Sequence, residues 1–261
     1  MSSGTHQLQR VLRVRDGIAV SVGIAIGAGI LRTPGLIAGY LGSAWVILAV
    51  WALGGVVVAL STLMLAEMAA ALPEAGGKYV YARRAWGPTM GFVAGWAELL
   101  VNRGFSGASK AVVIAEYVRI LAGGRGSLPL LSLAVCLAFF LLHTRGLKAG
   151  TTFQNFTTAI KVLVILLIAG AGIWGGDLAG FKASPRLMDG PTTGLLALAL
   201  AYQSVSFAYY GWEDAAKMGA EIKDPGRALP RILLGGSLAV MALYLVLNVA
   251  FLAALTPDEM A

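Results

Sequence analysis

Residues 23–35, which read Gly-Ile-Ala-Ile-Gly-Ala-Gly-Ile-Leu-Arg-Thr-Pro-Gly, interrupt a long apolar run with glycine and proline. A second interrupted run contains residues 206–214, which read Ser-Phe-Ala-Tyr-Tyr-Gly-Trp-Glu-Asp. In a bilayer, backbone that leaves helical hydrogen bonding has to line a cavity or be buried in protein. The two stretches are therefore candidate sites at membrane depth.

The composition of the chain excludes an ordinary soluble domain. Of the 261 residues, 58% are hydrophobic, another 34 are glycine, and only 13% are charged. Soluble domains are about 45–50% apolar with glycine included, and about 25% charged. The charged residues also fall in clumps between long uncharged runs. We therefore expect an all-α integral membrane protein that crosses the bilayer several times.

Seven segments are long and apolar enough to span a bilayer, which takes about 20 residues. They are roughly residues 16–40, 43–72, 88–121, 128–144, 152–174, 193–217 and 231–255. Helix breakers such as Pro73, Gly123 and Gly175 follow three of them. We expect about seven transmembrane helices after an N-terminal segment at residues 1–15, with no soluble domain between them.

The distribution of Lys and Arg predicts the orientation of these spans. With the N-terminus in the cytoplasm, twelve of the 20 basic residues lie on the cytoplasmic side, five lie outside, and three lie within spans. Cytoplasmic loops carry the excess of basic residues in membrane proteins. We therefore expect a multi-pass protein of the plasma or inner membrane with a cytoplasmic N-terminus, and the net charge of +7 indicates topology, not nucleic-acid binding.

The two interrupted spans are the first and the sixth, and they run in opposite directions. Paired interrupted helices at matching places are typical of inverted-repeat secondary transporters, which hold their substrate there. On this reading, residues 16–174 form the first five-helix repeat and residues 175–192 an extracellular loop. Residues 193–261 begin the second, inverted repeat with spans six and seven.

The residues of each interruption suit a zwitterion but leave other interpretations open. An unwound Gly27-Ala28-Gly29 would present backbone N–H groups at the positive end of a half-helix, where a carboxylate binds well. The alternative is that Gly23 and Gly27 form a small-residue packing seam. The aromatic residues from Phe207 to Trp212 would cover a small substrate, or else belong to a lipid-facing belt.

Other polar residues lie within the predicted spans. Glu213 and Asp214 end the aromatic run, and acidic residues inside a membrane are costly and usually functional. Lys161 lies deep in the fifth span, where it either extends to the interface or is held inside the bundle. In the third span Glu98 and Asn102 are helical neighbours, and the roles of Glu98, Arg103 and Lys110 stay open.

The sequence contains no pattern for a metal, a cofactor or an enzyme. Its one cysteine, Cys136, excludes an intrachain disulfide, and it has no cluster of histidines around it. No nucleophile occurs with a base and an orienting group at a suitable spacing. We therefore expect no metal, no cofactor and no enzymatic activity.

The motifs resemble those of the amino acid-polyamine-organocation superfamily, most closely its L-type amino acid transporter branch. Gly27-Ala28-Gly29-Ile30 resembles the Gly-x-Gly-Ile signature of its first helix. Residues 207–230 resemble its sixth helix and following loop through Phe-Ala-Tyr-x-Gly-Trp-Glu, Glu-Ile-Lys-Asp-Pro and Arg-x-x-Pro. The resemblance extends over all seven spans.

The resemblance implies a leucine-transporter-like fold and assigns roles to the residues that match. The backbone of Gly27, Ala28 and Gly29 would bind the substrate carboxylate. Carbonyls of Ala25 and Ile26, with those around Phe207 and Tyr210, would receive the α-ammonium. The substrate-binding set is thus Ala25, Ile26, Gly27, Ala28, Gly29, Phe207, Ala208, Tyr210 and Gly211, with Trp212 and Glu213 as further lining. Phe207 would be the aromatic gate, and Lys161 would occupy the place where sodium-coupled relatives bind a cation, which makes it the coupling residue.

The leading hypothesis is a secondary active permease that moves L-amino acids by alternating access, linked to protons or by exchange. Its partners would be the amino acid, protons and the bilayer, and the sequence leaves a partner subunit open. The family fold needs ten helices, so we expect the chain to be truncated after its seventh span. The alternatives are a non-transporting fragment or subunit of such a permease, and an integral membrane enzyme that acts on lipid.

Overall fold

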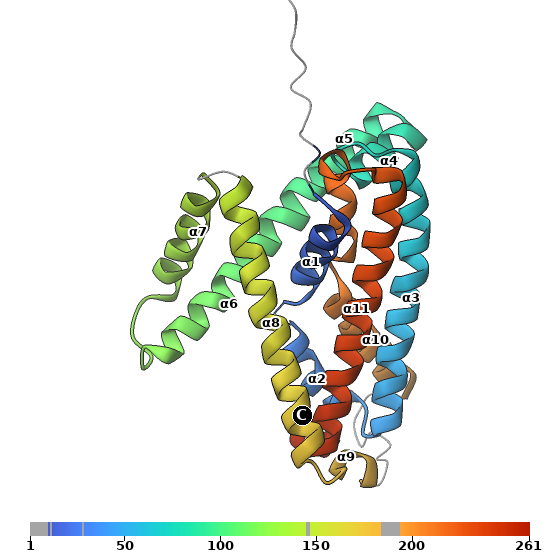
Figure 1. Ribbon diagram of the computed structural model, residues 1–261. Coiled ribbons are helices and arrows are strands. Elements are labelled where there is room, and N and C mark those ends of the chain that lie inside the picture. The colour runs from blue at the N-terminus through green and yellow to red at the C-terminus, as the bar shows by residue number, and fades with distance from the viewer. Residues whose placement is uncertain (1–9, 11, 28, 145–146, 184–193) are drawn as a thin grey trace, which may run out of the picture. The chain divides into compact units, whose positions relative to one another are not determined.

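The computed structural model describes residues 10, 12–27, 29–144, 147–183 and 194–261, which form two compact units (Figure 1). The first unit comprises residues 1–77 and 155–261, and the second comprises residues 78–154. The described residues are almost entirely helical and contain no strand, and Leu12 and Ile222 form an isolated bridge. The expectation of an all-α membrane protein is confirmed.

The first unit is built from the helices at the two ends of the chain. Its helices are α1 (Val14–Ala25), α2 (Gly29–Tyr40), α3 (Ala44–Ala71), α9 (Ala179–Lys182), α10 (Gly194–Tyr209), the 3₁₀ helix η2 (Trp212–Glu221), α11 (Pro225–Ala254) and α12 (Pro257–Met260). Helix α8 (Leu147–Gly175) belongs to this unit from Asn155 onward.

The long helices α3 and α11 pack side by side along most of their length and organise the first unit (Figure 1). Helices α1, α9 and η2 contact α11, while α10 contacts both α2 and α3. Trp51 of α3, Tyr209 of α10 and Tyr244 of α11 are among the largest fully buried side chains. The core of the unit therefore lies where α3, α10 and α11 meet.

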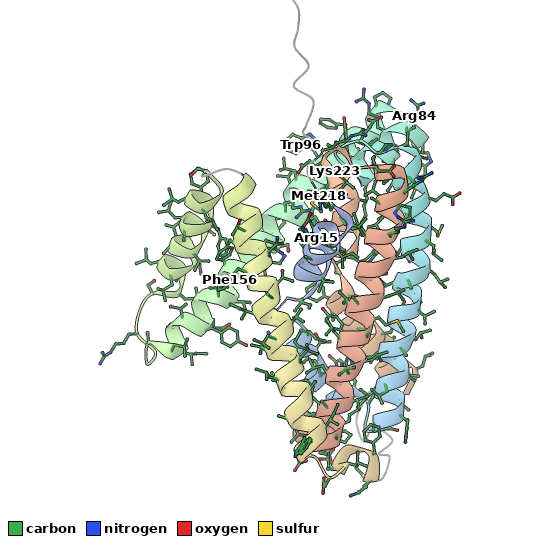
Figure 2. All side chains as sticks on the ribbon, viewed as in Figure 1. Arg15, Arg84, Trp96, Phe156, Met218 and Lys223 are labelled. Atoms are coloured by element: carbon green, nitrogen blue, oxygen red, sulfur yellow. The ribbon has the colours of Figure 1, made fainter. Side chains whose placement is uncertain are left out.

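The segment before α1 pairs with the segment after η2. The N–H of Leu12 donates to the carbonyl of Glu221 at 3.0 Å, and the N–H of Lys223 donates to the carbonyl of Leu12 at 2.9 Å. The result is a parallel β-bridge between Leu12 and Ile222. Figure 2 shows Arg15, Met218 and Lys223 near one another at this end of the unit.

Side-chain caps mark the first and last helices of the unit. The Asp16 carboxylate accepts the N–H of Arg13 at 3.0 Å, which satisfies a backbone donor ahead of α1. At α12 the Glu259 carboxylate accepts the N–H of Thr256 at 2.8 Å, and the Thr256 hydroxyl accepts the N–H of Glu259 at 3.4 Å. This reciprocal capping box lowers the pKa of the Glu259 carboxyl, because its bonds favour the charged form.

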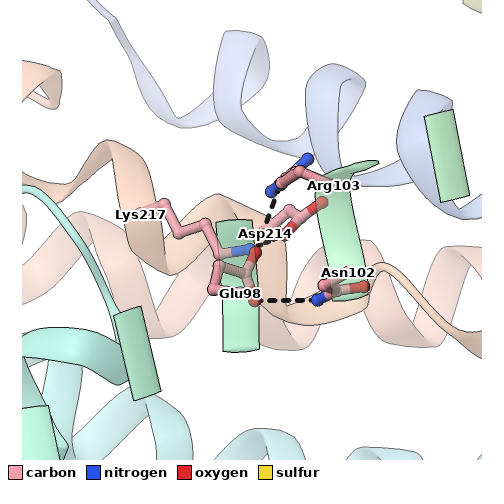
Figure 3. A network of polar contacts seen from close by, with 5 residues as sticks. All are labelled: Glu98, Asn102, Arg103, Asp214 and Lys217. Atoms are coloured by element: carbon pink, nitrogen blue, oxygen red, sulfur yellow. Dashed lines mark hydrogen bonds and ion pairs between the residues drawn. The ribbon is translucent and has the colours of Figure 1, made fainter. Parts of the chain in front are cut away.

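The second unit contains α4 (Lys78–Trp86), α5 (Pro88–Trp96), the π-helix η1 (Ala97–Phe105), α6 (Ser106–Leu121) and α7 (Leu128–Thr144). The Glu98 carboxylate in η1 accepts hydrogen bonds from Asn102 Nδ2 at 2.8 Å and from Arg103 Nε at 3.1 Å (Figure 3). In a π-helix each backbone N–H bonds to the carbonyl five residues earlier, whereas in an α-helix it bonds to the carbonyl four residues earlier. It therefore brings Arg103, five residues on, to the same carboxylate as Asn102.

The sequence predicts seven membrane spans, but fewer helices among the described residues are individually long and apolar enough to cross a membrane. Three are long and apolar enough, Ala44–Ala71, Thr152–Gly175 and Pro225–Ala254, and α1 with α2 gives a fourth if the bent pair counts as one span. The other three predicted spans are helical but shorter or divided. Residues 88–121 change from α to π and back, Leu128–Leu142 is a short apolar helix, and residues 193–217 are divided between α10 and η2.

Candidate functional site at two interrupted helices

The first interruption separates α1 from α2. Helix α1 ends at Ala25, α2 begins at Gly29, and the two are bent by 47° at the break. Ile26 has φ −73° and ψ 88°, and the N–H of Gly27 donates to the carbonyl of Ala25 at 2.9 Å. This is an inverse γ-turn in place of helical bonding. Ala28 lies outside the described residues.

The second interruption follows α10, which ends at Tyr209. The N–H of Tyr210 donates to the carbonyl of Phe207 at 3.1 Å, so the last turn tightens before the chain leaves the helix. Gly211 has φ 113°, a conformation that favours glycine, because a Cβ there is strained. The chain then continues as the 3₁₀ helix η2, in which the Asp214 side chain pairs with Lys217 (Figure 3).

The two interruptions lie against each other. A Cβ built on Gly211 would approach Ile24 Cγ2 to 3.0 Å and the Ile24 carbonyl carbon and oxygen to 3.5 Å. Helix α1 also contacts η2 along its length. The residues that the sequence singles out in spans one and six are therefore brought together, although they are far apart in the chain.

Tyr244 of α11 joins the two interruptions through its hydroxyl. Tyr244 Oη lies 2.8 Å from the carbonyl oxygen of Ala25 and 3.1 Å from that of Ala208, and both contacts are buried. Each carbonyl stands at the end of a helix, where regular helical partners run out. The Ala25 oxygen thus receives two donors, the N–H of Gly27 and the hydroxyl of Tyr244.

Sequence reasoning did not include Tyr244 in the site. The residue lies in a long apolar stretch, where a tyrosine can be read as part of an aromatic belt. The available signal was Asn248 one turn further on, because two polar side chains four residues apart at membrane depth share one helix face. In the structure, Asn248 Nδ2 donates to the carbonyl of Tyr244 at 2.8 Å.

Lys161 of α8 contacts the last turn of α1. Its Nζ donates to the carbonyl of Gly23 at 3.2 Å, and the contact is partly buried. The carbonyl of Gly23 precedes the interruption by two residues, and in an uninterrupted helix it would accept the N–H of Gly27. That N–H bonds to Ala25 instead. The ammonium group therefore compensates an acceptor that the break releases.

The remaining predicted residues divide by exposure. Ala208, Gly211 and Glu213 are buried, and Trp212 is half-buried. The side chains of Phe207 and Tyr210 are 75% and 47% exposed, so they do not lie in the core of the unit. Gly211 packs against Ile24 across the two interruptions, and the Ala208 carbonyl accepts the Tyr244 hydroxyl that also reaches Ala25.

The described residues contain no group of three His, Cys, Asp or Glu side chains that could hold a metal ion. The polar atoms at the interruptions include backbone carbonyls and N–H groups, the hydroxyl of Tyr244 and the ammonium of Lys161. Freed N–H groups favour a carboxylate, and freed carbonyls favour an ammonium.

Residues 13–261 match the sequence profile of the family described as amino acid permease. This chain belongs to the amino acid permease family. The match extends over both interrupted helices and over both compact units. The resemblance of its motifs to permeases is thereby confirmed, and the chain is a multi-pass membrane protein.

Several characterised transporters are similar to this family member. The serine/threonine exchanger SteT of Bacillus subtilis is 29% identical over 260 residues, which cover 99% of this chain and 58% of SteT. The b(0,+)-type amino acid transporter 1 of Mus musculus is 29% identical over 262 residues, covering 98% and 54%. The human Asc-type amino acid transporter 1 is 28% identical over 261 residues, covering 97% and 50%. The chain thus spans about half the length of these relatives.

Proposed function

We propose that this family member takes part in secondary active transport of L-amino acids, with the substrate bound between the two interruptions. The observation that carries the proposal is the hydroxyl of Tyr244, which lies within hydrogen-bond distance of the carbonyls of Ala25 and Ala208. Two helix ends therefore meet at one point, where a side-chain hydroxyl takes the place of regular helical donors. An amino acid supplies the donors and acceptors that such a point lacks.

The carboxylate of the substrate would bind at the start of α2. This helix has 12 residues, and its first N–H groups have no partner within the helix. They stand at the positive end of the helix dipole, where an anion is stabilised by about 0.3–1 kcal/mol or more when partly buried. The backbone of Gly27, Ala28 and Gly29 is our proposed carboxylate site.

The α-ammonium would be received by carbonyls at the two interruptions. An ammonium group has three donors, whereas the Tyr244 hydroxyl has one. The candidate acceptors are the carbonyls of Ala25 and Ile26 on one side, and those around Phe207 and Tyr210 on the other. Because the Ala25 oxygen already has two donors, we propose that the ammonium displaces the Tyr244 hydroxyl from it.

The side chain of the substrate would face the residues that follow α10. We propose that Phe207 and Tyr210 cover the substrate once it is bound, and that Trp212 and Glu213 line the site further on. The relatives include a serine/threonine exchanger and an Asc-type transporter. We therefore propose exchange of amino acids as the transport mode, and serine and threonine as the first substrates to test.

Lys161 is our proposed coupling residue. It holds the carbonyl of Gly23 beside the first interruption, so loss of its charge would release an acceptor next to the substrate. The protonation state of Lys161 would therefore affect the conformation of the interruption between α1 and α2. We propose that protons drive or modulate transport through this contact, and that the protein itself catalyses no chemical reaction.

We further propose the plasma or inner membrane as the location, with the N-terminus in the cytoplasm, from the excess of basic residues on that side. Residues 16–174 would be the first five-helix repeat and residues 193–261 the start of the second. The order of the helices supports this proposal, in which α1–α2 would open the first repeat and α10–η2 the second.

Binding and transport can be tested separately. The purified chain is incubated with a panel of L-amino acids, and the thermal unfolding midpoint is recorded, with the D-enantiomers as controls. We expect L-serine, L-threonine or a related neutral amino acid to raise the midpoint. Counterflow of the radiolabelled hit follows in proteoliposomes with a full-length version. Lack of any L-selective shift together with lack of counterflow would contradict the proposal.

A further inference from the structure

Tyr209 is the last residue of α10 and lies directly before the second interruption. Its side chain is fully buried, and its hydroxyl donates to the carbonyl of Trp51 in α3 at 3.2 Å. The bond crosses from one helix to another and is buried throughout. Breaking this bond would leave a buried hydroxyl and a buried carbonyl without a partner, which costs free energy. The contact therefore fixes the end of α10 against α3.

Two glycines of α3 make room for this contact. A Cβ on Gly55 would lie 3.0 Å from Tyr209 Oη, and a Cβ on Gly54 would lie 3.4 Å from the Tyr209 ring and closer still to Val205. Neither glycine has a positive φ, so backbone freedom is not the reason for them. Gly54 and Gly55 together form a notch on α3, and the end of α10 fits into this notch.

A second tyrosine holds the neighbouring residue from the other side. The rings of Tyr209 and Tyr244 have centroids 5.1 Å apart, and both pack edgewise on Trp51 at 5.8 and 5.6 Å. While Tyr209 bonds to α3, the Tyr244 hydroxyl reaches the carbonyl of Ala208. Two consecutive residues at the end of α10 are therefore held from two directions.

We propose that Tyr209, seated in the notch of Gly54 and Gly55, is a positioning residue that determines where α10 stops, and thus where the backbone of Tyr210 and Gly211 meets the substrate. This inference rests on the proposed function for the substrate. Removal of the Tyr209 hydroxyl would leave the packing of the ring intact but would let the last turn of α10 shift. The consequence would be confined to residues 210–214 and to substrate affinity.

The test compares Tyr209→Phe with the matched control Tyr202→Phe in the whole chain. Tyr202 lies two turns earlier on the same helix, is half-buried, and makes no hydroxyl hydrogen bond in the part of the chain that the structure describes. Hydrogen exchange measured by mass spectrometry follows the amides of residues 210–214, two of which bond to Phe207 and Gly211. The affinity for the best L-amino acid is measured on the same samples.

We expect Tyr209→Phe to speed exchange at residues 210–214 about two- to tenfold, the range expected for one hydrogen bond, and to weaken substrate affinity by a similar factor. Exchange in α11 should stay unchanged, and Tyr202→Phe should match the wild type in both measurements. Equal acceleration across α10 and α11 would indicate general loosening and overturn the proposal. Unaltered exchange at residues 210–214, or unaltered affinity, would also overturn it.

A double variant tests the notch itself. Gly55→Ala should speed exchange at residues 210–214 in the wild-type background, because the added methyl group would lie 3.0 Å from the Tyr209 hydroxyl and displace it, besides displacing the Met241 side chain, whose Cγ would lie 2.6 Å away. In the Tyr209→Phe background the same change should have a clearly smaller effect, and additive effects would overturn the role of the notch. If the wild type binds no amino acid, the proposed function fails, while the exchange data still decide whether Tyr209 positions the break.

Discussion

At the scale of single residues, the hydroxyl of Tyr244 lies within hydrogen-bond distance of two carbonyls at helix ends, where regular helical donors run out. Tyr244 has one proton, and the carbonyls of Ala25 and Ala208 both lie within 3.1 Å of its oxygen. The proton can bond fully to only one of them at a time. This arrangement holds the two helix ends together through a single side chain.

Replacing Tyr244 by Phe should destabilise the protein by about 1–3 kcal/mol, because the Ala208 carbonyl loses the Tyr244 hydroxyl and the Ala25 carbonyl loses one of its two donors, while the ring packing is kept. The change would be measured as a lower midpoint of thermal unfolding in detergent. Tyr117→Phe on the exposed face of α6 is the control and should leave the midpoint unchanged. An unaltered midpoint for Tyr244→Phe would show that the hydroxyl does not hold the two breaks.

Lys161→Gln should abolish proton-dependent uptake in a full-length version while leaving membrane insertion intact. The amide still reaches toward α1 but carries no charge to stabilise the Gly23 carbonyl, which the break deprives of its helical donor. Uptake of radiolabelled substrate is recorded as a function of pH, with Lys182→Gln in α9 as the control. If uptake keeps its pH dependence in Lys161→Gln, the lysine has no part in coupling.

Some of these residues could be predicted from the sequence and others could not. Gly27 stands out because it lies in a single apolar run that also holds Gly23, Gly29 and Pro34, and Lys161 stands out because a lysine is unusual in an apolar run. The structure places both at the first interruption. Trp51 and Tyr209 do not stand out, because aromatic residues are common in membrane helices and the Tyr209 hydroxyl bonds to a backbone carbonyl, that of Trp51. A carbonyl is present at every position and therefore leaves no signal in the sequence.

At the scale of helices, Gly211 permits the second interruption. Gly211→Ala should cost about 2 kcal/mol or more, because an L-residue is strained at φ 113° and the new Cβ would lie 3.0 Å from Ile24. We also expect loss of amino acid binding, since the backbone on both sides of the break has to move. Unfolding midpoints and ligand-induced thermal shifts measure the two effects.

Gly170→Ala is the matched control for Gly211→Ala. Gly170 lies within α8 in helical conformation, and a Cβ there meets nothing within 4 Å. Alanine is favoured over glycine in a helix by about 1 kcal/mol, so this variant should be as stable as the wild type or slightly more stable. If both variants behaved alike, the strain at Gly211 would not be what shapes the break.

The π-helix η1 shows how helix type limits prediction from sequence. The spacing of Glu98 and Asn102 predicts neighbours on an α-helix, and the two side chains do form a hydrogen bond. On an α-helix, a residue five positions further lies on another face, so the sequence gives no reason to pair Glu98 with Arg103. The pair exists because residues 97–105 form a π-helix, which no simple periodicity reveals.

At the scale of the whole molecule, the order of helices could be predicted but the number of long, regular spans could not. Composition and apolar runs identify a multi-pass membrane protein, and every predicted segment is helical among the described residues. A span that breaks or changes helix type is not a single long apolar helix. Such breaks and changes of type depend on contacts between residues that are distant in the sequence. The meeting of Ile24 with Gly211 and the bonds of Tyr244 are of this kind.

The bridge between Leu12 and Ile222 gives the last prediction, because it joins the segments next to α1 and η2. Paired segments lie about 4.8 Å apart, within the distance of about 4.4–6.8 Å between Cα atoms that a disulfide needs. With Cys136 changed to Ser, the pair Leu12→Cys and Ile222→Cys should therefore cross-link under mild oxidation and raise the thermal midpoint. Loss of free thiols measures the reaction, and a reductant should reverse both effects. The pair Leu12→Cys and Leu255→Cys should stay reduced. Leu12 pairs with Ile222 just before α11, whereas Leu255 follows the last residue of this 30-residue helix, about 45 Å away at 1.5 Å per residue. Equal oxidation of both pairs would mean that the segment before α1 is not held at Ile222.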